Sequence, residues 1–298
     1  MIKLKIVGKV IKLDIPEKFI WQYMPVFACD DSLEEDIVID ITRGEIPEMP
    51  AEAVKNFDFI TPAGDSVHNV YTIGGDVYYS RFTNHYIAYL KYKRDYKRFT
   101  VCMNENIPGE GLDGDAEYVR KRAVFFAVRR AFLMIMAANG GFEIHSSALL
   151  YKGEAVVFSA MAGTGKTTHT NLWKEVFPDE VEIINGDKGL CVPEQSGSYI
   201  HGWPWCGSSG RFMNIKAPIK AIVFLERAEE NGITRISSVP ECFMRLTSRC
   251  FMPVWENDLF MKTLDMVENV ARSVDCYLLR CLPDHDAARV AEREIFKR

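Results

Sequence analysis

The sequence has no excess of basic residues. Lysine and arginine number 36 against 41 aspartate and glutamate residues, which gives a formal net charge of −5. A surface that binds nucleic acid needs a basic excess on one face, so we expect no nucleic-acid partner. The single basic run, "YLKYKRDYKRF" at 89–99, alternates with Tyr, Leu and Phe, and this is typical of a strand with one solvated face.

The sequence also lacks paired cysteines and long apolar runs. Its eight cysteines include no CxxC pair and no Cys/His cluster at zinc spacing, which favours reduced thiols, most of them in the core. The most apolar helical stretch is broken by Arg129 and Arg130 and is too short to cross a bilayer. Residues 1–15 alternate lysine with aliphatic residues, which is a strand pattern and not a signal peptide. We therefore expect a cytoplasmic protein with no membrane partner.

Short alternating runs fill the chain up to about residue 115, at 1–15, 36–42, 67–82, 85–92 and 98–102. Turn signals such as "IGGD" separate them. This pattern predicts a mostly antiparallel, β-rich module over residues 1–115. The segment rich in glycine and aspartate at 108–115 is the candidate boundary.

From residue 116 the pattern changes to helices alternating with strands. Apolar residues at helical spacing predict a helix over 116–138 that Gly140 and Gly141 would end. The remaining elements are expected as strands at 142–151, 154–160, 181–186, 189–192, 198–203, 221–227 and 276–282 and as helices near 165–177, 241–250, 257–273 and after Pro283. We therefore predict a mixed α/β fold with a second domain over 116–298.

The stretch "SAMAGTGKTT" at 159–168 has the composition of a phosphate-binding loop. It follows an apolar strand and precedes a helix, which is the context that this motif requires. Gly163 and Gly165 permit a tight turn whose N–H groups, with the helix dipole, can hold an anion. Lys166 would reach the terminal phosphates of ATP, and the Thr167 hydroxyl would bind Mg²⁺. The predicted nucleotide-binding residues are Ala162, Gly163, Thr164, Gly165, Lys166, Thr167 and Thr168.

Two features qualify this motif. Ala160 stands where the pattern GxxxxGK[ST] has its first glycine, and a Cβ there is tolerated only if φ is negative. Phosphoryl transfer also needs a carboxylate to hold the metal, usually at the end of a neighbouring strand. "VEIINGDKG" offers Asp187, about 20 residues beyond Lys166, although an aspartate after Asn-Gly is also a common turn residue.

These residues resemble the P-loop proteins of the HPr kinase/phosphorylase and phosphoenolpyruvate-carboxykinase type, and most closely the HPr-kinase-related proteins. The resemblance rests on His145 before the loop, then "AGTGKTT", "INGDKG", and "HGWPWCGSSG" followed by "APIKAIVFLER". It covers about residues 140–290 and implies a nucleotide-binding core of that type. It also implies that Lys166 and Thr167 handle phosphate and metal. Asp187 would then be the metal ligand or general base, with His145 near the transferred phosphoryl group.

The chain departs from the HPr kinases at one position. Those proteins have two adjacent aspartates at the end of the second strand, whereas the matching pair here is Gly186-Asp187 or Asp187-Lys188. One carboxylate is missing, which leaves open which group would deprotonate the acceptor. His145 is a candidate base, although a single histidine on a strand is as often structural. The carboxykinase reaction itself is not expected, because those enzymes are much longer.

A second loop, "HGWPWCGSSGRF", follows the strand at 198–203. Trp203 and Trp205 around a proline would form a stiff apolar platform, Gly207 to Gly210 would follow a ligand closely, and Arg211 would meet phosphate. The alternative is a buried aromatic corner with a flexible turn. Cys206 is expected to be a small packing residue.

Together these observations predict an ATP- and Mg²⁺-dependent kinase that phosphorylates a hydroxyl, either on a serine of a protein or peptide or on a small molecule. The catalytic residues would be Asp187, His145 and Lys166, and the metal ligands Thr167 and Asp187. Two alternatives stay open: a nucleotide-binding accessory protein without catalysis, and a P-loop ATPase of another lineage. The expected partners are a nucleotide and a hydroxyl-bearing acceptor, with a homo-oligomer as a further option.

Overall fold

The structure is a computed structural model that describes residues 1–44, 54–60, 67–82, 88–104 and 116–297. The chain divides into two compact units, Met1–Ile135 and Met136–Arg298, and the division falls within helix α1 (Ala116–Ala138). The predicted boundary segment, 108–115, lies outside the described residues. No helix in the described ranges combines the length and the apolar character needed to cross a membrane.

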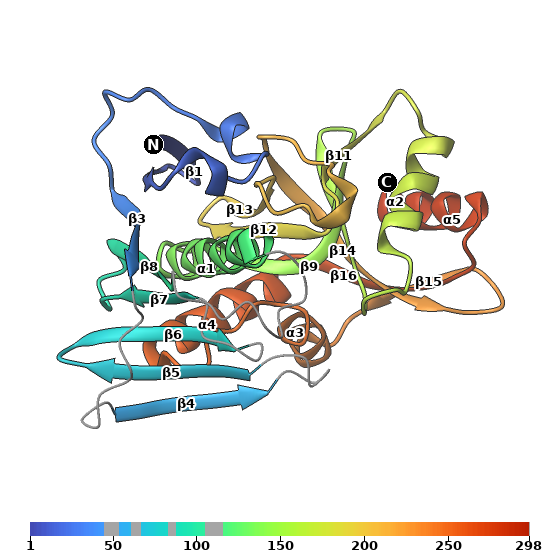
Figure 1. Ribbon diagram of the computed structural model, residues 1–298. Coiled ribbons are helices and arrows are strands. Elements are labelled where there is room, and N and C mark those ends of the chain that lie inside the picture. Colours follow the sequence, from blue (N-terminus) through green and yellow to red (C-terminus); the bar gives the residue numbers. More distant parts are fainter. Residues whose placement is uncertain (45–53, 61–66, 83–87, 105–115, 298) are drawn as a thin grey trace. The chain divides into compact units, whose positions relative to one another are not determined.

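The first unit contains an eight-stranded sheet in the order β1-β2-β3-β8-β7-β6-β5-β4 (Figure 1). The strands are β1 (Ile2–Ile6), β2 (Lys9–Asp14), β3 (Ile37–Gly44), β4 (Val54–Ile60), β5 (Val67–Ile73), β6 (Asp76–Phe82), β7 (Ala88–Tyr92) and β8 (Arg98–Asn104). Two short turns of 3-10 helix, η1 (Glu17–Phe19) and η2 (Met24–Phe27), separate β2 from β3. Among the described strands of this sheet, only the β2–β3 and β3–β8 pairings are parallel, so the sheet is mixed with mostly antiparallel pairings.

Helix α1 has the bounds that the sequence predicts, because its end is coded locally. Gly140 adopts a left-handed φ of +94°, and the Gly141 N–H donates to the Met136 carbonyl at 2.9 Å. This geometry satisfies a carbonyl of the last turn and redirects the chain into the next strand.

The second unit is built on a sheet in the order β10-β9-β12-β13-β14-β16-β15, with β11 also paired to β9. Its strands are β9 (Phe142–Tyr151), β10 (Glu154–Ser159), β11 (Val181–Asn185), β12 (Lys188–Glu194), β13 (Gly197–His201), β14 (Lys216–Arg227), β15 (Gly232–Ile236) and β16 (Asp275–Cys281). Strands β10, β14 and β16 are parallel, whereas the other described pairings are antiparallel. Both units therefore contain mixed sheets, and the α/β class is confirmed.

Helices cover the two faces of this sheet. They are α2 (Lys166–Val176), α3 (Val239–Thr247), α4 (Asn257–Ser273) and α5 (His285–Ile295). Figure 1 shows α2 beside α5 and α3 beside α4. Successive side chains of β10 point to opposite faces of the sheet. Val156 and Phe158 therefore pack in the core around Trp173, whereas Ala155 and Val157 pack in the core beneath α3 and α4.

The expectation of reduced thiols is wrong at two positions. Cys242 of α3 and Cys276 of β16 form a disulfide. Their Cα atoms are 6.4 Å apart because α3 packs on the sheet face to which Cys276 belongs. The two cysteines are 34 residues apart in the chain, so spacing alone gave no sign of the bond. Cys191 and Cys206 are free and buried.

Candidate functional site

The glycine-rich loop connects β10 to α2, as the motif requires. Gly163 and Gly165 have φ angles of +76° and +119°, a region that disfavours side chains, and Gly165 is the N-cap of α2. Ala160 does not have a positive φ, and its methyl group is buried in the core around Trp173. The missing first glycine therefore does not disturb the turn, and the N–H groups at the start of α2 remain free to bind an anion.

The loop residues differ in their exposure. Ala162, Gly163, Thr167 and Thr168 are exposed, and Thr164 and Gly165 are partly buried. Lys166 is buried, and its Nζ donates to the Ala160 carbonyl at 3.2 Å. Burial lowers the pKa of Lys166, against the opposing effect of the Asp187 charge.

An arginine that the sequence reasoning did not single out holds the loop. The Arg227 Nη2 at the end of β14 donates to the Gly163 carbonyl at 2.5 Å. Strand β14 runs parallel to β10, so both strands end at the same edge of the sheet. Arg227 could have been expected near the site from the sequence, since ligands of α/β sheets bind outside the carboxyl ends of parallel strands.

Strand β9 positions His145 level with the N-terminus of α2. Tyr151 packs against Trp173 of α2 with ring centroids 5.3 Å apart, and the Ser147 hydroxyl lies 3.1 Å from the Thr170 hydroxyl one turn after the loop. Alternate residues of a strand share a face, so His145 lies on the α2 side, about 7 Å beyond Ser147. It therefore projects in front of the helix terminus.

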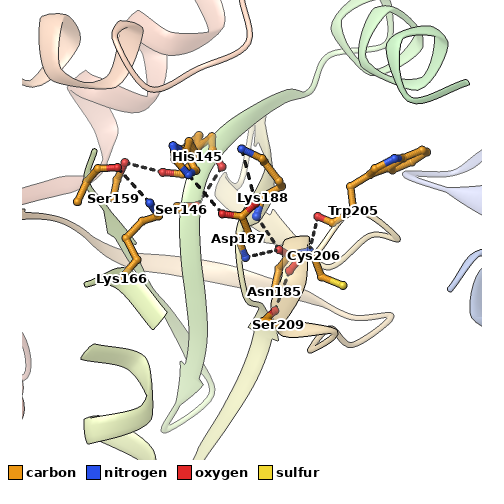
Figure 2. A network of polar contacts seen from close by, with 12 residues as sticks. His145, Ser146, Ser159, Lys166, Asn185, Asp187, Lys188, Trp205, Cys206 and Ser209 are labelled. Carbon is orange, nitrogen blue, oxygen red and sulfur yellow. Dashed lines mark hydrogen bonds and ion pairs between the residues drawn. The ribbon is translucent and has the colours of Figure 1, made fainter. Parts of the chain in front are cut away.

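His145 and Asp187 form a pair at this position, as Figure 2 shows. Their Nε2 and Oδ1 atoms are 3.3 Å apart, and Lys188 Nζ lies 3.6 Å from Asp187 Oδ2. Burial opposes ionisation of Asp187, but the His145 hydrogen bond and the charges of Lys188, His145 and Lys166 outweigh it and lower the pKa to about 2. Asp187 is therefore a carboxylate at neutral pH.

Asn185 holds the turn that presents Asp187. It is fully buried, and its Nδ2 donates to the carbonyls of Trp203 and Trp205 at 3.2 and 3.4 Å. Its Oδ1 accepts from the N–H groups of Asp187 and Lys188 at 3.1 and 2.8 Å. Asn185 is not among the residues predicted from the sequence, although an asparagine two residues before the candidate carboxylate is the usual sign of such a turn.

Packing explains why no second carboxylate stands beside Asp187. A Cβ at Gly186 would lie 2.0 Å from Ser209 Oγ, within the 3-10 turn η3 (Gly207–Ser209). A Cβ at Gly207 would lie 2.6 Å from the Asp187 Cβ. The turn therefore packs against both Gly186 and Asp187. Gly207 lies close to the Asp187 carboxylate, whereas the sequence predicted that it would lie along a ligand.

The rest of the second loop is an aromatic corner. Trp203 and Trp205 are 0% and 3% exposed, so they offer no open platform, and the alternative of a buried corner is confirmed. The Trp203 Nε1 donates to the Lys188 carbonyl at 2.6 Å, and Arg211 Nη1 donates to Asn171 Oδ1 of α2 at the same distance. Cys206 is buried, and burial raises the pKa of its thiol, as expected of a packing residue.

No group of three or more His, Cys, Asp or Glu side chains in the described ranges is arranged to hold a metal ion. The protein ligands predicted for Mg²⁺ are the exposed Thr167 hydroxyl and the Asp187 carboxylate. Such a set fits this ion, because Mg²⁺ is usually held by one or two carboxylates together with substrate phosphates and water.

Residues 119–284 match the family of the SynChlorMet cassette protein ScmC. The match covers more than half of the chain, which therefore belongs to this family. A comparison with curated proteins finds no match. Among solved structures, the chain is similar to the Hpr(Ser) kinase/phosphatase from Coxiella burnetii, at 10% identity and a TM-score of 0.29, over 50% of this chain and 86% of that one. A similarity of this size carries no conclusion about function.

Proposed function

We propose that the chain is an ATP- and Mg²⁺-dependent phosphotransferase with a nucleotide-binding core of the HPr-kinase type. It would transfer a phosphoryl group to a hydroxyl of a peptide, protein or small molecule. One observation carries the proposal: the His145–Asp187 pair projects in front of the N-terminus of α2, next to Lys166. A phosphate held by the loop would present its terminal group to this pair.

Each side chain has a role that follows from its surroundings. The N–H groups of the loop and Lys166 would hold the terminal phosphates of the nucleotide. Thr167 and Asp187 would hold the metal, and bound Mg²⁺ supplies charge neutralisation on the phosphate oxygens. Arg227 would hold the loop in place through its hydrogen bond to the Gly163 carbonyl.

A single carboxylate is compatible with transfer. The transition state of phosphoryl transfer is loose in most analyses, so positioning and charge neutralisation contribute more than removal of the acceptor's proton. Asp187, whose pKa is about 2, is a weak base. It fixes the His145 ring by accepting from Nε2. As the acceptor oxygen bonds to the γ-phosphorus and the bond from that phosphorus to the oxygen of ADP breaks, His145 or Asp187 would take the proton of the acceptor hydroxyl.

The test is a pair of substitutions. We expect Lys166→Ala to abolish the thermal stabilisation that ATP and Mg²⁺ give the wild type, whereas Lys220→Ala, which removes a partly exposed lysine paired with Glu154, keeps it. We expect Asp187→Asn to retain nucleotide binding and to lower acceptor-dependent ADP release by at least about 100-fold. Unchanged stabilisation in Lys166→Ala would disprove the nucleotide site.

The second candidate is a nucleotide-binding accessory protein without catalysis. The close packing of Ser209 against Gly186 favours it, because that packing leaves no room for a second carboxylate beside Asp187. It predicts binding of ATP with no ADP release that depends on an acceptor. A P-loop ATPase, the third reading, predicts hydrolysis without any acceptor. Screening serine, related alcohols and serine-containing peptides for ADP release separates the three.

The remaining expectations belong to the same proposal. An ATP-dependent reaction fits the cytoplasm, and the acidic net charge of −5 fits an acceptor other than nucleic acid or a membrane surface.

A further inference from the structure

Three basic side chains form a row across the sheet in front of α2. Lys188 of β12 pairs with His145 in register. On the other side of β9, Ile144 bridges Cys250 in antiparallel fashion, and the His145 N–H donates to the Arg249 carbonyl at 2.8 Å. Directly opposed residues of antiparallel segments share a face. Arg249, His145 and Lys188 therefore line the same face, and Figure 2 shows the His145 and Lys188 end of this row.

The row carries more positive charge than is needed to neutralise the Asp187 carboxylate beside it. The charges that act on Lys166 are one carboxylate, Asp187, and two cations, Lys188 and Arg249. Counting Lys166 itself, these charges are three permanent cations and one anion. A phosphate loop uses one lysine and its backbone N–H groups for the nucleotide, so Lys188 and Arg249 exceed what the loop needs.

The Arg249 guanidinium also has a hydrogen-bond donor that is not satisfied within the described residues. Its Nε is buried and has no partner among the described residues. Its Nη1 reaches the carbonyl and hydroxyl of the adjacent Ser248 at 3.3 and 3.4 Å. A buried donor without a partner is costly, and an arginine fork is suited to binding an oxyanion.

We infer that Arg249 and Lys188 form a second anion subsite, flanking His145, for an acceptor that carries an oxyanion next to its reacting hydroxyl. The inference rests on the proposed function, since in-line transfer requires the acceptor beyond the terminal phosphate, which is the space over His145. The oxyanion is a phosphate or a carboxylate. Binding it would orient the hydroxyl toward His145 and Asp187.

In the test, the proposed nucleotide site is saturated before any anion is added. The protein is saturated with Mg²⁺ and a non-hydrolysable ATP analogue, and inorganic phosphate or acetate is then titrated in by calorimetry. We expect one of these anions to bind the complex, and the one that binds identifies the acceptor's charged group. Arg249→Ala should weaken that binding about 10- to 100-fold, with partial recovery in Arg249→Lys, while analogue affinity changes less than about threefold.

Controls separate this inference from the proposed function. Arg272→Ala, which removes the same charge from the exposed face of α4, should leave anion binding unchanged. Melting temperatures show whether each variant is folded. A wild type that binds the analogue but neither anion would overturn the subsite alone, as would equal losses of analogue and anion affinity in Arg249→Ala. A wild type that does not bind the analogue would overturn the proposed function.

Discussion

A substitution at Gly186 tests whether packing excludes a second carboxylate beside Asp187. Gly186→Asp adds the second carboxylate, but its Cβ would lie 2.0 Å from Ser209 Oγ and 2.8 Å from Ser209 Cβ. Glycine is not required there by a positive φ, so the clash is the main cost. Overpacking of this kind costs about 1–3 kcal/mol. For a domain of about 150–250 residues, this lowers the melting temperature by roughly 2–12 °C.

The assay is thermal unfolding followed by circular dichroism. Gly186→Ala isolates the steric part, and Gly232→Asp is the matched control, because a Cβ at Gly232 meets no atom within 4 Å. Adding Ser209→Gly to Gly186→Asp removes the clashing atoms and should restore at least about half of the loss. If Gly186→Asp melts within about 1 °C of the wild type, or if Ser209→Gly restores nothing, the packing explanation is wrong.

Three further predictions concern side chains around the site. Asn185→Ala removes four hydrogen bonds, two of them buried and two part-buried, so we expect a loss of at least about 2 kcal/mol in urea unfolding and a larger loss of turnover than of nucleotide affinity; equal losses would contradict a positioning role. Arg227→Ala should weaken nucleotide binding about 3- to 10-fold through the released Gly163 carbonyl, with unchanged affinity in calorimetry as the contrary result. Burial and a neighbouring lysine lower the pKa of His201 to about 4. The unfolded chain therefore takes up a proton at higher pH than the folded chain, and stability falls as the pH drops from about 6.5 to 4. His201→Gln should lose less melting temperature than the wild type between about pH 7 and pH 4.5, and equal losses would refute the assignment.

Much of the second unit follows from local signals in the sequence. Helix α4 has its predicted bounds, as does helix α1, most of which belongs to the first unit, since apolar residues recur at helical spacing and glycines or polar residues mark the ends. Strand β9 also matches, because its apolar run is bounded by turns. Strand β15 was not predicted: its five residues are mostly exposed and pair with β16 alone, so its pattern is weak.

The candidate site likewise contains some residues that the sequence predicts and others that it does not. The loop and Asp187 could be found because motif and spacing lie within one stretch of chain. The proximity of Arg249 and Lys188 to His145 could not, because it depends on strand register between segments that are distant in sequence. The clash at Gly186 is likewise a tertiary feature, set by a turn more than 20 residues further along the chain.

The surroundings of Asp187 indicate that Asp187 and His145 have separate roles in the proposed reaction. A carboxylate with a pKa of about 2, held by the Asn185 turn and closed in by Gly207, remains charged and accepts a proton poorly. We therefore expect Asp187 to act on the metal and on the orientation of His145. If so, the ADP release lost in Asp187→Asn rises again with Mg²⁺ concentration, because the weakened metal site is refilled by mass action. His145→Gln should show no such recovery, since proton transfer and not metal affinity is lost. The measurement is acceptor-dependent ADP release over a Mg²⁺ titration, with binding of the ATP analogue followed in parallel. Recovery of both variants, or of neither, would mean that the two residues do not have these separate roles.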